Sequence, residues 1–235
     1  MLEPIVIMGG FLSQPSDYLN WKEKLSKPPY IRRVFIADIG RVAWALTRDD
    51  NFKPQLSALQ AAVERARRAT GADKVWIVAH SAGGRVARLW LGDKPYAGVK
   101  WDGQRYTTGL ISLGSPYLTK EPWALRSAAF ANDNYPGAFY EHITYVAAIG
   151  KSVLGRSNGS IEERFAFNSY GIQMPGKGSQ WGDGVITVEG AQIPGAENHA
   201  FEGIYHTGLL GRPSYDANRA LKIWASKLVT EITIG

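Results

Sequence analysis

One stretch decides the fold of this 235-residue chain: Val75-Trp-Ile-Val-Ala-His80-Ser81-Ala-Gly83-Gly84-Arg-Val-Ala-Arg-Leu-Trp-Leu91. Its first five residues form an unbroken apolar run, which is typical of a strand buried on both faces of a parallel sheet. Residues 82–91 predict a helix, and Ser81 stands at the joint between Ala79 and Gly83. Small neighbours let strand and helix approach closely, so this turn would expose the serine hydroxyl beside the positive end of a helix.

Outward from this stretch, strand and helix patterns alternate along the chain. Apolar runs predict strands at 4–8, 34–37, 110–113 and 143–149. Helices are predicted at 17–26, with Ser16 or Asp17 as cap, from Pro54 to a closing Gly71, and at 218–230. This alternation favours an α/β protein with a mostly parallel sheet and helices on both faces. No linker divides the chain, so a single domain over 1–235 is expected.

Two regions depart from this alternation. Residues 96–108 contain Asp102-Gly103 between Trp101 and Tyr106, which predicts a β-hairpin with that pair at its tip. Residues 116–140 are rich in turn residues and aromatics, and they are expected to form a lid segment over a cleft.

Composition excludes several classes of protein. The chain has no cysteine and four histidines without a zinc motif, so we expect no thiolate chemistry, no metal site and no cofactor. The net charge is +6, but the cations are scattered, and the densest group (Arg65, Arg67 and Arg68) falls on one predicted helix. We therefore expect no nucleic-acid partner. The sequence contains no signal-peptide pattern and no membrane-spanning run, which together with the missing cysteines favours the cytoplasm.

The turn at Ser81 follows the pattern G-x-S-x-G, with Ala79 at the first glycine. Here the sequence resembles the α/β-hydrolase superfamily, in particular compact lipase-like and esterase-like members. The resemblance implies a serine nucleophile followed along the chain by an acid and then a histidine. It also implies a reduced fold without the antiparallel leading strands of larger members.

A second stretch, Gly155-Arg-Ser157-Asn-Gly159, matches the pattern letter for letter. No apolar run leads directly into it, and Asn158-Gly159 is typical of a turn. Ser160 is expected to cap a short helix over 161–167. We therefore interpret Ser157 as a loop residue and Ser81 as the nucleophile.

The resemblance also suggests the acid and the base. Asp183 stands between Gly182 and Gly184, and the following Val-Ile-Thr-Val188 resembles the Gly-Asp-Gly-Val-Val pattern of lipase-like members. His206 comes 23 residues later in a Gly-Ile-Tyr-His context that the resemblance favours, and His199 is the alternative. Of the other two histidines, His80 is expected to pack and His142 to be structural or exposed.

An oxyanion hole needs two backbone N–H donors. One is expected from Ala82, directly after the nucleophile. The other is expected from Phe11, because Met8-Gly9-Gly10-Phe11-Leu12 resembles the His-Gly-Phe or Pro-Gly-Phe loop of lipase-like enzymes, although Gly9 replaces the usual His or Pro. Leu113-Gly114-Ser115-Pro116 similarly resembles the Leu-Gly-Thr-Pro segment of lipases.

These features predict a serine hydrolase that cleaves carboxylic esters, with acyl-lipid or other apolar acyl esters as substrates. Leu12, Trp123 and Phe130 are expected to bind substrate. The aromatic residues of these segments either line an apolar cleft or serve in packing; they are Phe11, Trp123, Phe130, Tyr135 and Phe139. Acyltransferase, thioesterase and amidase activities use the same three residues and stay open, as does a non-catalytic ligand-binding protein. Peripheral contact with a lipid surface is compatible with the charge, and the oligomeric state is open.

Overall fold

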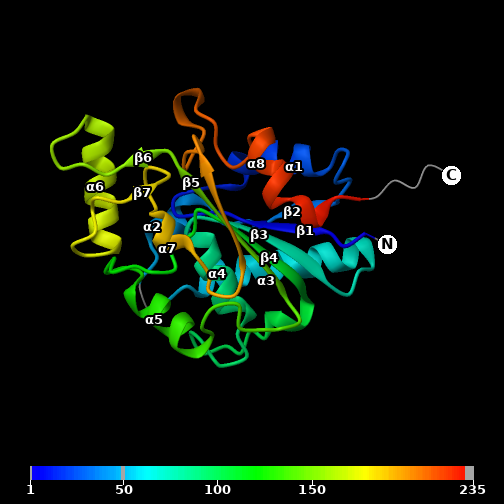
Figure 1. Cartoon of the computed structure of the whole chain (residues 1–235). Coiled ribbons are helices and arrows are strands. Elements are labelled where there is room, and N and C mark those ends of the chain that lie inside the picture. The colour runs from blue at the N-terminus through cyan, green and yellow to red at the C-terminus, as the bar shows by residue number, and fades with distance from the viewer. Residues whose placement is uncertain (1, 49–50, 231–235) are drawn as a thin grey trace.

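A parallel sheet of six strands forms the centre of the molecule (Figure 1). The structure is a computed structural model that describes residues 2–48 and 51–230, so residues 1, 49–50 and 231–235 of the predicted domain lie outside the described residues. The strand order is β2-β1-β3-β4-β5-β8, and every neighbouring pair is parallel. The strands are β1 (Ile5–Met8), β2 (Val34–Ile36), β3 (Val75–His80), β4 (Thr107–Leu113), β5 (Thr144–Lys151) and β8 (Glu197–Glu202). The predicted α/β architecture is confirmed.

Each face of the sheet carries its own apolar core because side chains alternate along a strand. In β1, Val6 and Met8 face a core shared with α3 (Lys53–Thr70) and α4 (Ala82–Leu91). Ile5 and Ile7 face the other core, which is shared with α1 (Leu19–Leu25) and α8 (Asn218–Trp224). Figure 1 shows these two pairs of helices on opposite sides of the sheet. Burial on both faces explains why the central strands are continuous apolar runs.

The strongest helix signals are confirmed and the weaker ones are shifted. α4 has the predicted bounds, and α3 is followed by the predicted Gly71, whose left-handed φ of 73° suits a glycine. The first helix begins later than predicted: residues 15–18 form a 3₁₀ turn, and Tyr18 rather than Ser16 or Asp17 stands at the N-cap of α1. α8 ends at Trp224, before a further 3₁₀ turn at 226–228. α6 (Ile161–Gln173) has the predicted Ser160 cap but is longer than expected.

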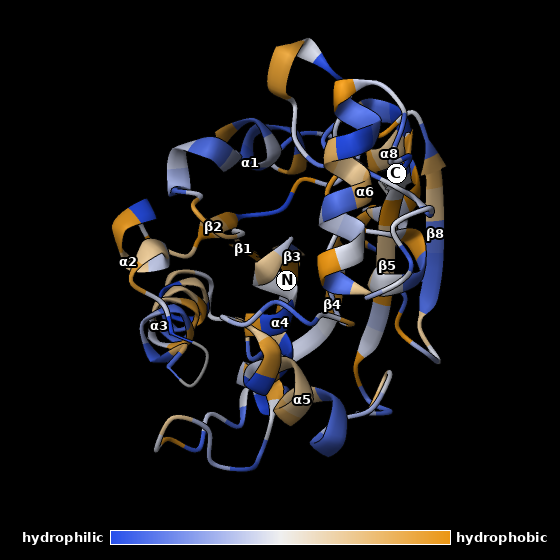
Figure 2. Ribbon diagram, turned by 90° about the vertical axis from the view of Figure 1, so that its left-hand side faces the viewer, coloured by the Kyte–Doolittle hydropathy of each residue, from blue (hydrophilic) through white to orange (hydrophobic). Residues whose placement is uncertain are grey.

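The sequence analysis did not predict β8, because this strand is polar. Its residues Glu197, Asn198 and His199 are unlike a buried strand, and all but Phe201 are at least partly exposed. β8 lies at the edge of the sheet beside β5 and is mostly blue in Figure 2. An edge strand faces solvent more than its neighbours do, so an apolar run is not required there.

The predicted hairpin is displaced. A single antiparallel bridge joins Tyr96 to Val99, and its turn is Ala97-Gly98, with φ values of 51° and 75°. Asp102-Gly103 is not a hairpin tip, because Gly103 begins a 3₁₀ turn that packs on Trp90. A side chain at position 103 would lie within 2.2 Å of that indole ring, so close packing is what requires the glycine here.

The expected lid segment 116–140 contains α5 (Leu125–Asn134). Buried Arg88 of α4 donates to the Asn132 side chain and to the carbonyl of Tyr135, which ties the second half of the segment to the body of the molecule. The remaining elements are α2 (Arg41–Ala45), α7 (Val188–Ala191) and a small antiparallel pair, β6 (Val153–Leu154) and β7 (Trp181–Gly182). Among the described residues, no helix is long and apolar enough to cross a membrane.

Candidate active site

Ser81 occupies a sharp turn between the end of β3 and the start of α4. Its φ of 53° and ψ of −130° are strained for a serine. The N–H of Ser81 donates to the Leu113 carbonyl at 2.9 Å, and its own carbonyl accepts from Gly84 at 3.0 Å. A side chain at Gly83 would lie within 2.4 Å of the Met8 carbonyl oxygen, so a glycine at this position lets α4 pack against the end of β1.

The strand order places this turn where ligands bind in open parallel sheets. The chain leaves β1 for β2 on one side and later adds β3 on the other, so the order switches between β1 and β3. Ligand sites form outside the carboxyl ends of the strands at such a switch point. Gly10 and Ser81 meet there: a side chain at Gly10 would lie 2.6 Å from Cβ of Ser81.

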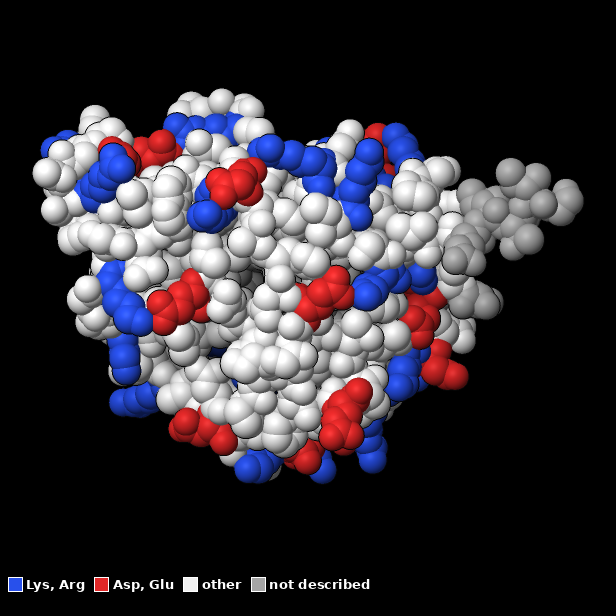
Figure 3. Space-filling model, viewed as in Figure 1, with Lys and Arg blue, Asp and Glu red and all other residues white. Residues whose placement is uncertain are grey.

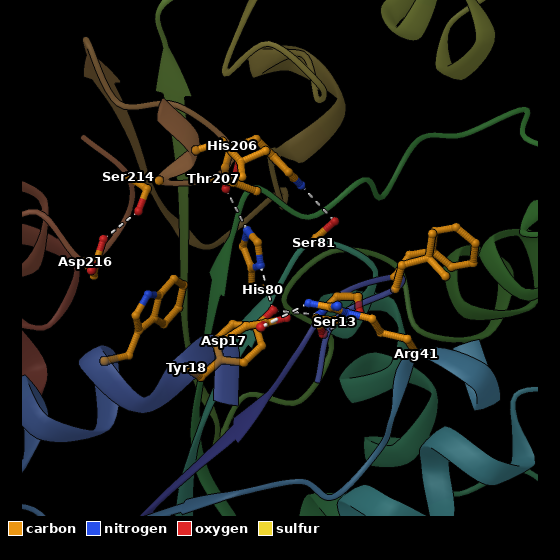
Figure 4. Close-up of a pocket in the computed structure, with 16 residues that line it drawn as sticks. Ser13, Asp17, Tyr18, Arg41, His80, Ser81, His206, Thr207, Ser214 and Asp216 are labelled. Atoms are coloured by element: carbon orange, nitrogen blue, oxygen red, sulfur yellow. Dashed lines mark hydrogen bonds and ion pairs between the residues drawn. The ribbon is translucent and has the colours of Figure 1, made fainter. Parts of the chain in front are cut away.

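The structure brings Ser81, His206 and Asp183 into one hydrogen-bonded line. His206 Nε2 lies 3.0 Å from Ser81 Oγ (Figure 4), and His206 Nδ1 lies 2.7 Å from Asp183 Oδ2. The N–H of His206 also donates to the Asp183 carbonyl at 3.0 Å, which fixes the two residues to each other through the main chain. These three residues are the ones that the sequence suggested, although they are 125 and 23 positions apart.

The Asp183 carboxylate is fully buried and fully hydrogen-bonded. Oδ1 accepts from the N–H groups of Val185 and Ile186, and Oδ2 accepts from the Tyr215 hydroxyl at 2.7 Å as well as from His206. Burial by itself raises the pKa of Asp183, but His206 and these donors outweigh it and hold the pKa below its ordinary value. The carboxylate is therefore ionised at neutral pH.

Sequence reasoning missed Tyr215. Its hydroxyl donates to Asp183 and accepts from the Gly150 N–H at 3.1 Å, and burial raises its pKa well above the ordinary value. It stays a neutral donor that orients the acid. No motif marks this tyrosine, because it lies 32 residues beyond Asp183 and reaches it only through the fold.

The alternative residues lie elsewhere. His199 is on β8, where it contacts Glu197 at 2.9 Å, and His142 is exposed with a 3.3 Å contact to the Gln104 carbonyl. Ser157 lies exposed in a turn between β6 and α6. His80 is buried as expected, but it does more than pack: its ring lies between Tyr18 and His206 with a hydrogen bond to each (Figure 4).

The loop after β1 lies against Ser81, where an oxyanion hole is expected. The N–H of Gly10 is engaged by the Tyr18 hydroxyl at 2.9 Å, so the next amide along the loop, that of Phe11, is the candidate donor. Ala82 is the first residue of α4, and N–H groups in a first helical turn have no partner within the helix. A side chain at Gly9 would lie 2.6 Å from the Tyr18 ring, so the His or Pro that lipase-like enzymes have at this position would not fit here.

A cavity of about 520 Å³ opens above Ser81. Phe11, Leu12 and Leu209 contribute apolar surface to it, while Asp17, Arg41 and Asp216 contribute polar surface. Leu12, which is expected to bind substrate, is among the residues that line the cavity. Trp123 stacks on Phe11, with ring centroids 4.7 Å apart, and so supports the wall of the cavity without being among the residues that line it.

The expectation for Phe130 is wrong. Its ring packs against Tyr96, at 5.0 Å between centroids, and against Tyr135 at 6.4 Å. Phe130 and Tyr96 lie on the core beside α4 and are not among the residues that line the cavity. Tyr135 in turn contacts Phe139 at 5.4 Å, and neither of these rings lines the cavity.

Several solved structures that are similar to this chain in fold are called lipases or esterases. No protein-family model and no curated protein matches the chain. The mature lipase BlEst2 of Bacillus licheniformis superposes with a TM-score of 0.64 at 15% identity, over 97% of this chain and 93% of that one. EstA of Clostridium botulinum gives 0.61 at 11% identity, over 97% and 87%. A monoacylglycerol lipase of Paleococcus ferrophilus gives 0.52 at 10% identity, over 97% and 95%.

The chain therefore has the α/β-hydrolase fold, as the resemblance implied. The likeness extends over nearly its whole length, although few residues are identical.

Proposed function

We propose that this protein is a serine hydrolase that cleaves carboxylic esters through an acyl-enzyme on Ser81. The observation that carries the proposal is the continuous line of hydrogen bonds from Ser81 Oγ through His206 to Asp183, at 3.0 and 2.7 Å. A nucleophile within reach of a base that is oriented by a buried carboxylate is the arrangement that activates a serine.

The geometry supports one sequence of steps. Ser81 Oγ attacks the acyl carbon while His206 Nε2 takes the hydroxyl proton. The N–H groups of Phe11 and Ala82 bind the oxyanion of the tetrahedral intermediate. As the C–O bond to the alcohol breaks, His206 returns the proton to the leaving oxygen. Water, activated by the same histidine, then releases the acid from Ser81. Asp183 stays ionised throughout and stabilises the charged imidazole.

An ester with an apolar acyl group is the substrate that the cavity suits best. Phe11, Leu12 and Leu209 border it beside Ser81, and its volume of about 520 Å³ holds a chain of many methylene groups. The similar solved structures that are called lipases support the same substrate class.

We further propose that the protein meets a lipid surface through the rim of this cavity. The loop 207–212 carries Leu209 and Leu210, which are 73% and 93% exposed. Ile161 and Phe165 of α6 are also exposed, and with this loop they line a second hollow of about 460 Å³ that reaches His206. The loop stands out from the molecule in Figure 1, and in Figure 3 its tip is white above blue atoms. Apolar side chains at a projecting tip beside the site suit insertion among acyl chains.

The test is hydrolysis of p-nitrophenyl esters from acetate to palmitate by the wild type and by Ser81→Ala. We expect turnover by the wild type, a chain-length optimum above acetate, and a loss of at least about 10³-fold in Ser81→Ala. Matched thioester and anilide substrates in the same assay measure thioesterase and amidase activity. Equal rates for wild type and Ser81→Ala would contradict the assignment of the nucleophile.

A further inference from the structure

A buried chain of hydrogen bonds runs directly behind Ser81 and connects two loops of the site. The N–H of Gly10 donates to the Tyr18 hydroxyl at 2.9 Å, and that hydroxyl lies 2.9 Å from His80 Nδ1. On the other side of the ring, His80 Nε2 lies 3.0 Å from the main-chain carbonyl oxygen of His206. His80 thus joins residues 62 positions before it and 126 positions after it (Figure 4).

The chemistry of the partners fixes the direction of every bond. A carbonyl oxygen only accepts, so His80 Nε2 carries the proton and donates to His206. In the neutral ring Nδ1 is then an acceptor, and the Tyr18 hydroxyl must donate to it. The Tyr18 oxygen in turn accepts from Gly10. Only one tautomer of a neutral His80 therefore satisfies all three contacts.

The surroundings keep His80 neutral. The rings of Tyr18, Trp21, His206 and Tyr215 lie within 5.9 Å of it, centroid to centroid. Burial, and then repulsion from His206, lower the pKa of His80 to about 3, although the nearby Asp183 charge opposes this. A neutral ring at 4.9 Å does not repel the positive charge that His206 gains when it takes the proton from Ser81.

We propose that His80 is a positioning residue for the reaction. It holds the main chain of His206 in place behind Ser81, and through Tyr18 it holds the loop that presents the Phe11 amide. This inference rests on the proposed function, since it assigns His206 as the base. The His80 side chain would then fix the position of the base, His206, relative to the oxyanion donor, the Phe11 amide, although these two residues lie near opposite ends of the chain.

The loop that carries His206 needs such a support. The residues that follow His206 project from the molecule, and Leu209 and Leu210 among them are largely exposed. Few apolar contacts therefore hold this loop. On its other side the N–H of His206 is held by the Asp183 carbonyl. The two bonds clamp the peptide groups on either side of His206, and a displacement of about 1 Å at a reacting group costs up to about 10²-fold in rate.

Three variants and a control test the inference. His80→Phe keeps a flat ring but removes both hydrogen bonds, while His80→Gln keeps an N–H that can reach the His206 carbonyl. Tyr18→Phe removes the hydroxyl that links His80 to Gly10 and leaves the hydrogen bond from His80 to the His206 carbonyl in place. Tyr117→Phe is the matched control: Tyr117 and Tyr18 are both 4% exposed, and this variant also removes a buried hydroxyl, which donates to Ser112 and makes no hydrogen bond to His80 or His206.

The first measurement is ester hydrolysis, with kcat and KM determined separately and with folding checked by thermal melting. We expect His80→Phe to lower kcat by about 10²-fold with KM changed less than about threefold. His80→Gln should recover to within about tenfold of the wild type, and Tyr18→Phe should lose about three- to tenfold. Tyr117→Phe should keep kcat within about twofold. If His80→Phe stays within threefold of the wild type, or the control loses as much, His80 does not position the base.

The second measurement needs no substrate. The chain has four histidines, so histidine-selective ¹⁵N labelling gives a sparse NMR spectrum in which a His206→Gln variant identifies the Nδ1–H signal bonded to Asp183. We expect His80→Phe to shift this signal and Tyr117→Phe to leave it. An unmoved signal in His80→Phe overturns the inference even if the wild type hydrolyses esters. A moved signal in a protein that hydrolyses no ester supports the positioning of His206 while the proposed function fails.

Discussion

Two serines of this chain stand in nearly the same pattern of letters and in opposite settings. Ser81 lies in Ala79-His-Ser-Ala-Gly83, between a buried strand and a helix, with a strained backbone and a histidine 3.0 Å from its hydroxyl. Ser157 lies in Gly155-Arg-Ser-Asn-Gly159, exposed in a turn between a two-residue strand and α6. Only Ser157 matches the pattern G-x-S-x-G at every letter.

The difference lies in what surrounds the pattern. At Ser81 the glycine two positions later is packed against the main chain of β1, within reach of the Met8 carbonyl. At Ser157 the loop is held by turn contacts, such as the Gly159 N–H to the Arg156 carbonyl at 3.3 Å. The reactivity of a serine depends on the strand and helix that position it and on the base that takes its proton. The flanking glycines only let the strand and the helix approach each other.

The largest expected effect separates the two serines by activity. Ser81→Ala should lower ester turnover by at least about 10³-fold, and Ser157→Ala should keep it within about twofold. A fluorophosphonate probe should label the wild type on the peptide that contains Ser81, as located by mass spectrometry. Label on Ser157, or full turnover by Ser81→Ala, would reverse the comparison.

The second effect separates the two glycines by stability. Gly83→Ala places a methyl group against two main-chain carbonyl oxygens of the β1 loop, which cannot move independently, so we expect the free energy of unfolding to fall by about 3 kcal/mol. Gly159→Ala meets mainly the Glu163 side chain, which is partly exposed, so we expect a loss within about 1 kcal/mol. Urea unfolding of both variants measures the difference. Equal losses would mean that the turn at Ser81 is not tightly packed against β1.

The same contrast shows which parts of the fold could be predicted from the sequence. The bounds of β1, β3 and α4 agree with the prediction within one residue, because burial on both faces requires an apolar run. β4 begins three residues before its predicted start, because its first residues, Thr107 to Gly109, are not apolar. β8 was missed because an edge strand has no such run. The tip of the hairpin was misplaced because Gly103 serves close packing on Trp90 rather than a turn, and a sequence does not separate these two uses of glycine.

The site divides in the same way. Ser81, Asp183 and His206 stand in local patterns that a resemblance can supply, and the structure brings their side chains together. Tyr215 and the bridging role of His80 had no local signal, because both act through contacts between distant segments. Phe130 was misassigned because an aromatic residue in a loop-rich stretch has the same letter whether it lines a cavity or packs on a core.

The third effect compares the residues that precede the two serines, His80 and Arg156. Because the folded-state pKa of His80, about 3, lies below its ordinary 6.5, the unfolded chain binds more protons between these values. The free energy of unfolding should therefore fall as the pH is lowered through this window, by about 2 kcal/mol between pH 6.5 and 5 from this group. The ordinary pKa of Asp183, 3.8, lies below that range.

Urea unfolding at pH 6.5 and 5 measures this loss in the wild type, in His80→Gln and in Arg156→Gln. His80→Gln should remove about 2 kcal/mol of the difference between the two pH values, because glutamine does not titrate. Arg156 is exposed and pairs with Glu163 at 3.2 Å, so Arg156→Gln should leave the difference unchanged. An unchanged difference in His80→Gln would show that a protonated His80 is tolerated in the folded protein.

The smallest effect concerns Ser160, the residue directly after the second pattern. Ser160 caps α6: its hydroxyl accepts from the Glu163 N–H at 3.3 Å, while the Glu163 carboxylate accepts from the Ser160 N–H at 2.8 Å. Ser160→Ala should lower the free energy of unfolding by about 1 kcal/mol and leave kcat unchanged, because the cap serves the helix and touches no reacting group. Thermal melting and ester assays on the same sample test both parts. A loss of kcat without a loss of stability would show that this loop takes part in the reaction, and the two serines would then be less different than their settings indicate.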